Sequence, residues 1–239
     1  MPDPGIHPDT TRQRPAVPAP AHPSVAAAAR AHLPMVTAAG VVFVAFETAA
    51  AVRGDASAAS YAAEMILLFW LVLVADRFIG FSEAVLWCLV AWSALHMAGG
   101  LVATGHGRVL YNEPLGVPGI HYDRVVHAFG FGTATAACWQ ALRRCREGPA
   151  PTFGLVVLAA LAALGLGALN ETAEFLMTRV SSTTSIGGYR NTGFDLISNA
   201  VGATAVATWI YVRGRTRRPM ESSAVRGHAD RPVGAGGIS

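Results

Sequence analysis

Apolar residues in this chain come in blocks of about twenty, and this feature constrains the fold more than any other. A helix needs about 20 mainly apolar residues to cross the hydrocarbon core of a bilayer. Six segments have that length: residues 33–52, 61–79, 82–102, 122–146, 152–178 and 194–212. Charged residues make up only 14% of the chain, against roughly 25% in soluble domains. The sequence therefore predicts an all-α integral membrane bundle of about six transmembrane helices.

The two ends of the chain differ in composition from these blocks. Residues 1–31 contain seven of the 14 prolines, and residues 214–239 are rich in Arg and Gly. Both segments are predicted to be disordered cytoplasmic tails, because they lack the apolar residues that a packed core needs. Residues 32–213 would then form a single six-helix transmembrane domain. The N-terminal segment lacks the short apolar core and cleavage site of a signal peptide.

The distribution of arginine predicts the orientation, since the chain has no lysine. With six spans both tails share one side. Apart from Arg226 and Arg231 in the C-terminal tail, that side has eleven arginines, namely Arg12, Arg14, Arg30, Arg77, Arg143, Arg144, Arg146, Arg213, Arg215, Arg217 and Arg218, and the opposite loops have five, namely Arg53, Arg108, Arg124, Arg179 and Arg190. Basic residues favour the cytoplasmic side, so both tails are predicted to be cytoplasmic. The net charge of +3 is therefore attributed to the orientation of the protein in the membrane. The expected partner of the protein is the lipid bilayer, and no nucleic acid is expected to bind.

Polar residues inside the predicted spans gather near the end opposite the tails. An ionisable group at the bilayer centre costs about 2.5–3.5 kcal/mol on insertion scales, so such groups usually face a protein interior or a wet cavity. We expect a pocket near the outer face, formed by His96, Asp123, His127, Asn170, Glu171, Glu174, Asp195 and Asn199. Glu47 and Glu64 have a similar depth, but they could instead pair with Arg53 or face lipid headgroups.

Helical spacing relates several of these residues. Asp123 and His127 are four residues apart, so the carboxylate can orient the imidazole; alternatively, Asp123 only caps its helix. Asp195 and Asn199 repeat this spacing. Gly202 lies on the same helix face, and its lack of a side chain would let another helix approach closely. The alternative for the second pair is a helix cap followed by an interhelical hydrogen bond.

Glu171 and Glu174 are harder to explain as structural residues. They share a helix face with Asn170, close to a helix C-terminus, where the dipole disfavours negative charge. His96 is a weaker candidate, because a single histidine in an apolar span is commonly a buried structural residue.

The predicted pocket contains oxygen and imidazole groups but no thiol. This combination suits hard or borderline divalent cations, and it also suits proton transfer. If a divalent metal ion binds, we expect its ligands to come from Asp123, His127, Glu171, Glu174 and Asp195. The sequence has no GxSxG, HExxH, P-loop or dinucleotide motif, so it does not identify catalytic residues.

The order of these motifs carries a family resemblance. The chain contains, in this order, His96-Met97 with Gly99-Gly100, Tyr122-Asp123-Arg124-x-x-His127, Asn170-Glu171-x-x-Glu174 and Asp195-x-x-x-Asn199-x-x-Gly202. Together these motifs resemble the YjdF-like family of multi-pass bacterial inner-membrane proteins, which has no established activity. The series is more distantly similar to VanZ-like proteins, which are linked to glycopeptide resistance.

The resemblance covers residues 35–212. It implies a bacterial inner-membrane location, a fold and the place of the site, but no reaction. Family members often have Trp-Asp just before the last helix, where this chain has Arg190-Asn191, so no ligand role is predicted at that position.

Three classes of function stay open at this point. The protein could bind a cation, an envelope ligand or a lipid headgroup without catalysis. It could be an intramembrane enzyme that acts on a lipid-linked or cell-wall substrate through a metal or acid–base chemistry. A proton- or cation-coupled transporter fits less well, because the inner half offers only Asp76, Arg77 and Glu83 to continue a polar path.

Overall fold

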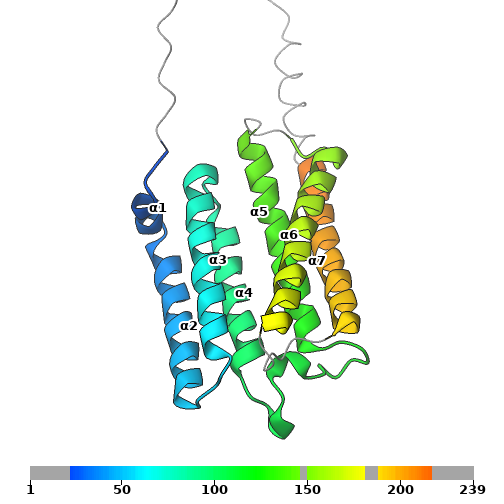
Figure 1. Cartoon of the computed structure of the whole chain (residues 1–239). Helices are drawn as coiled ribbons and strands as arrows, with labels where there is room; N and C mark the ends of the chain where they lie inside the picture. Colours follow the sequence, from blue (N-terminus) through cyan, green and yellow to red (C-terminus); the bar gives the residue numbers. More distant parts are fainter. Residues whose placement is uncertain (1–21, 146–149, 181–187, 217–239) are drawn as a thin grey trace, which may run out of the picture.

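A computed structural model describes residues 22–145, 150–180 and 188–216 (Figure 1). These residues form seven α-helices and two short 3-10 turns, with no named strand. The elements are α1 (Val25–Ala31), α2 (Leu33–Val52), α3 (Ala58–Ile79), α4 (Glu83–Leu101), η1 (Gly105–Gly107), η2 (Leu110–Asn112), α5 (Tyr122–Cys145), α6 (Phe153–Val180) and α7 (Tyr189–Thr216).

Four of these helices are both long and apolar enough to cross a membrane: α2, α3, α4 and residues Phe153–Arg179 of α6. Their large apolar side chains are exposed in the isolated chain, with Val41, Leu71 and Leu161 more than half exposed. Such surfaces suit lipid rather than water as the surrounding solvent. The prediction of an all-helical membrane protein with several long apolar helices is therefore confirmed.

Helices α5 and α7 have the length of spans but a more polar sequence. They contain 24 and 28 residues, which corresponds to about 36 and 42 Å of helix. Several of their polar side chains are buried in the bundle, including His127, Thr135, Asp195 and Asn199. These groups therefore lie against other helices and not on the outer surface of the bundle.

The long helices alternate in direction, and the two ends of the described chain, α1 and the last turn of α7, lie at the same end of the bundle (Figure 1).

Helices α5 and α7 pack backbone against backbone. A Cβ atom added to Gly202 on α7 would lie 1.8 Å from the carbonyl oxygen of Ala128 on α5, and one added to Gly132 would lie 3.2 Å from the carbonyl oxygen of Gly202. The predicted close approach at Gly202 is thus present, and it brings the polar faces of the two helices together.

The helix boundaries differ from the prediction most at the starts of α1 and α7. Residues 25–31 form α1, capped by Ser24, whose Oγ accepts a hydrogen bond from the Ala27 amide at 3.2 Å; the sequence predicted an irregular tail there. Helix α7 begins at Tyr189, five residues before the predicted start. The remaining parts of both predicted tails, residues 1–21 and 217–239, lie outside the described residues.

The connection between α4 and α5 folds back over the end of the bundle opposite the termini (Figure 1). Thr104 donates a hydrogen bond to Glu113 at 2.7 Å, and Arg108 pairs with the same carboxylate at 3.4 Å. Isolated bridges join Ala103 to Val109 and Pro114 to His121. These contacts position η2 against α4 and α5.

Candidate functional site

His127 lies at the centre of a polar cluster formed by α5, α6 and α7. It is largely buried, and its two ring nitrogens face different groups. Nε2 lies 3.3 Å from Oδ1 of Asp123, one helical turn earlier. Nδ1 lies 3.0 Å from Oδ1 of Asn199 and 3.8 Å from Oε1 of Glu171. Since an amide oxygen only accepts hydrogen bonds, the contact with Asn199 requires a proton on Nδ1, and Nε2 faces the aspartate.

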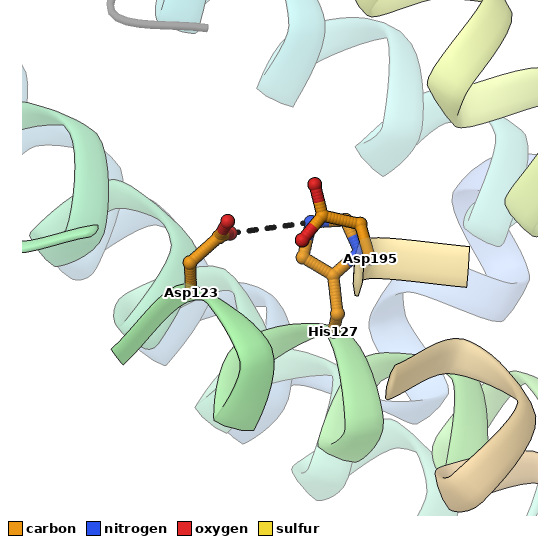
Figure 2. A group of neighbouring side chains, drawn as sticks. All are labelled: Asp123, His127 and Asp195. Carbon is orange, nitrogen blue, oxygen red and sulfur yellow. Dashed lines mark ion pairs between the residues drawn. The ribbon is translucent and has the colours of Figure 1, made fainter. Parts of the chain in front are cut away.

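Asp195 on α7 lies beside this pair (Figure 2). Its Oδ2 accepts a hydrogen bond from the side-chain amide of Asn191 at 2.5 Å, and the same amide lies 3.4 Å from Oδ2 of Asp123. Asn191 therefore contacts one oxygen of each carboxylate. Oδ1 of Asp195 is buried and has no hydrogen-bond partner among the described residues.

The two glutamates of α6 border the cluster on the Nδ1 side. Asn170 donates a hydrogen bond to Glu174 at 2.9 Å, as their four-residue spacing predicts. Glu171 is only 6% exposed, yet neither of its carboxylate oxygens has a hydrogen-bond partner in the described part of the chain. A buried polar group without a partner costs about 1–3 kcal/mol, and more if it is charged. This arrangement favours a positively charged or hydrogen-bond-donating ligand at Glu171.

Arginine does not neutralise this cluster within residues 22–145, 150–180 and 188–216. The only arginine ion pair there joins Arg108 to Glu113. Arg124, which follows Asp123 in sequence, stacks on the Phe194 ring with its Cζ atom 3.9 Å from the ring centroid. One imidazole thus faces four carboxylates, and a bound cation would reduce the excess of negative charge.

Two sets of side chains have the spacing of metal ligands. One consists of Asp123, His127 and Asp195, and the other of His127, Glu171 and Glu174. In each set one ligand atom from every residue lies within 4.8 Å of the others. A central ion bound at about 2.0–2.2 Å by nitrogen and oxygen ligands would fit either set after small side-chain rotations.

His96 belongs to a neighbouring cluster built on α3, α4 and η2. Its Nε2 lies 3.4 Å from Glu64, and its Nδ1 lies 2.5 Å from the hydroxyl of Tyr111. No hydrogen bond or ion pair among the described residues joins it to the His127 cluster. The structure therefore places six of the other seven candidate residues around His127, and it places His96 in the neighbouring cluster.

Two glycines on α4 make room for aromatic rings in the His96 cluster. A Cβ atom at Gly99 would lie 2.4 Å from the Tyr111 ring, and one at Gly100 would lie 1.9 Å from Tyr61. Arg53, considered above as a partner for Glu47 or Glu64, instead donates a hydrogen bond to the Leu101 carbonyl at 2.6 Å.

Sequence reasoning missed Asn191, which contacts both aspartates. Asn191 is four residues before Asp195, but this spacing relates the two side chains only if both lie on one helix. The predicted helix began at Phe194, whereas α7 begins at Tyr189. It also missed Tyr111, because the irregular connection that carries it has no helical periodicity to show which way a side chain points.

Together the fold and the cluster define a helical membrane protein with a buried acid–imidazole site near one end of its bundle. A family model described as "Predicted membrane protein (DUF2238)" matches residues 31–216. The chain belongs to this family, which is the YjdF family, so the resemblance predicted from the motifs is confirmed. Comparison with curated proteins and with solved structures gave no match.

Proposed function

We propose that the protein binds a divalent cation through Asp123, His127 and Asp195. The observation that carries this proposal is the buried carboxylate of Asp195: its Oδ1 has no partner in the described chain, and one of its oxygens lies within 4.8 Å of a ligand atom from each of Asp123 and His127. Two carboxylates and one imidazole, without a thiolate, suit borderline ions such as Mn²⁺ or Zn²⁺.

The residues around this set support a metal site. In metal sites the ligating histidine commonly donates its other ring N–H to an oxygen acceptor, and Asn199 supplies such an acceptor 3.0 Å from Nδ1. Asn191 contacts Asp123 and Asp195 through their Oδ2 atoms. This leaves the Oδ1 atoms of the two aspartates without a contact to Asn191.

Electrostatics also favours a cation. If Asp123 and Asp195 are both ionised, two unit negative charges 4.8 Å apart, the upper limit for these ligand atoms, repel each other by about 3.5 kcal/mol at an effective dielectric constant of 20. A divalent ion between them replaces this repulsion by attraction to both carboxylates. Glu171 and Glu174 add negative charge on the opposite side of the imidazole, so they strengthen the same preference.

The proposal includes an orientation. We infer six membrane spans, with α5 and α7 crossing as the shielded members of the bundle, and both tails in the cytoplasm of a bacterial cell. The eleven-to-five distribution of arginine supports this orientation. The cation site would then open toward the outer face of the inner membrane, where an envelope ligand or a lipid headgroup could provide further ligands to the ion.

Titration calorimetry on the detergent-purified full chain tests the site. We expect one Mn²⁺ or Zn²⁺ ion to bind the wild type and the Asp195→Asn variant to lose at least a factor of ten in affinity, since an amide oxygen carries no charge. Glu64→Gln is the matched control, because it removes a carboxylate from the neighbouring cluster and should leave the affinity unchanged. Equal affinities for Asp195→Asn and the wild type would rule out the proposed ligand set.

A further inference from the structure

A second feature of the molecule, an apolar groove of about 370 Å³ between α2, α3 and α4, lies apart from the cation site. Gly40 and Phe43 from α2, Trp70 from α3, and Trp92 and Met97 from α4 are among its lining residues. Trp70 is 53% exposed, so the groove opens on the surface that α3 presents to the surroundings of the bundle.

The groove runs parallel to the helices. Its lining extends from His32 to Phe43 on α1–α2, from Met65 to Asp76 on α3 and from Leu86 to Met97 on α4. Each stretch spans eleven helical steps, or about 17 Å at 1.5 Å per residue. One leaflet of the hydrocarbon core is about 15 Å thick, half of the full 30 Å. The groove therefore has the length of one leaflet.

The shape of the groove favours a chain as its occupant. Its volume of about 370 Å³ extends over about 17 Å along the helices, so a single extended hydrocarbon chain can lie along it. A transmembrane helix of another protein would instead cover the groove from outside, and the experiments below distinguish the two occupants.

The ends of the groove differ in polarity. His32 and Asp76 are the charged or titratable residues that line it, and they lie together at the end nearest α1, with His32 Nε2 3.4 Å from Asp76 Oδ2. Asp76 also accepts a hydrogen bond from the Phe81 amide at 2.7 Å, so its carboxylate is held in place, and the imidazole of His32 is the more exposed of the two side chains. An apolar slot with one polar end matches a chain that has a polar head.

We propose that this groove holds one acyl chain of a phospholipid from the leaflet on the side of the two termini, with the headgroup beside His32. The lipid is a resident ligand of the α2–α4 half of the bundle. It fills space that the side chains of these three helices leave open, and so it stabilises the packing of α2 against α3.

Gly40 offers a variant that blocks the groove without disturbing protein contacts. It lines the groove, and a Cβ atom added to it has no neighbour within 4 Å. A leucine at this position would occupy the space of the acyl chain. Gly165 on α6 is the matched control, since it is also helical, has no neighbour within 4 Å of an added Cβ and lies outside the groove.

Native mass spectrometry of the full chain, released from detergent, tests the proposal. We expect the wild type and Gly165→Leu to retain one phospholipid per chain, and Gly40→Leu to lose at least four fifths of it. Retention of the same lipid by Gly40→Leu, no lipid on the wild type, or a second protein chain in place of lipid would each overturn the proposal.

Fluorescence provides a second test that needs no change at Gly40. In a variant that keeps Trp92 as the sole tryptophan, phosphatidylcholine vesicles with brominated acyl chains should quench the emission at least twofold more than they quench a variant that keeps only Trp139, which is 7% exposed. Equal quenching of the two variants would show that no acyl chain enters the groove.

Discussion

The contact between Gly202 and Ala128 gives the sharpest prediction, because the site depends on it. In Gly202→Ala, the distance from the new Cβ to the Ala128 carbonyl oxygen must rise from 1.8 Å to at least 3.0 Å. Helices α5 and α7 must therefore separate locally by about 1.2 Å. All three obstructing atoms belong to the backbone of Ala128, so no side-chain rotation can relieve the clash.

This separation acts directly on the cluster, since Ala128 follows His127 and Gly202 lies one turn beyond Asn199. The Nδ1–Oδ1 contact of 3.0 Å between His127 and Asn199 would lengthen to about 4.2 Å, beyond hydrogen-bond distance. Metal–ligand distances tolerate changes of only about 0.2 Å, so a shift of 1.2 Å between α5 and α7 should abolish cation binding. Overpacking of this kind typically costs about 1–3 kcal/mol of stability.

The assay is titration calorimetry with Mn²⁺ or Zn²⁺, together with thermal unfolding in detergent. Gly165→Ala is the control, because an added Cβ there has no neighbour within 4 Å, and it should match the wild type in both measurements. If Gly202→Ala bound the cation like the wild type and unfolded at the same temperature, the glycine contact would not position the site, and the reasoning would fail.

Three further predictions concern the surrounding chain. Replacing both Glu171 and Glu174 by Gln should leave expression and thermal stability at least at the wild-type level while weakening cation binding about tenfold; a large fall in melting temperature would show that the pair is structural. Gly100→Ala should displace the tyrosine ring that lies 1.9 Å from the added Cβ, lowering thermal stability but leaving cation affinity within about twofold. In intact cells, on a background without the native cysteines, an impermeant thiol reagent should label Val117→Cys and not Arg144→Cys, and the reverse pattern would invert the proposed topology.

The long apolar helices were predictable from the sequence because length and composition alone determine whether a segment can cross a bilayer. The predicted span 33–52 coincides with α2. The start of α7 was not predictable in the same way. Residues 189–193 are polar and include Gly193, so they resemble a loop although they continue the helix.

The cluster was partly predictable because helical spacing relates residues within one helix. The pairs Asp123 with His127 and Asn170 with Glu174 follow from a spacing of four residues. Contacts between helices, such as His127 with Asn199, were not available from spacing, because they depend on the crossing of α5 and α7. That crossing is set by the backbone contact at Gly202, which the sequence indicated only as a place of close approach.

The metal content of the purified full chain tests the central claim most directly. After expression in medium supplied with Mn²⁺ and Zn²⁺, inductively coupled plasma mass spectrometry should find about one equivalent of one of these metals in the wild type and in His96→Ala. His127→Ala removes the imidazole shared by both ligand sets, and it should retain less than a tenth of that amount. A wild type without metal, or a His127→Ala variant with the same content as the wild type, would contradict the account.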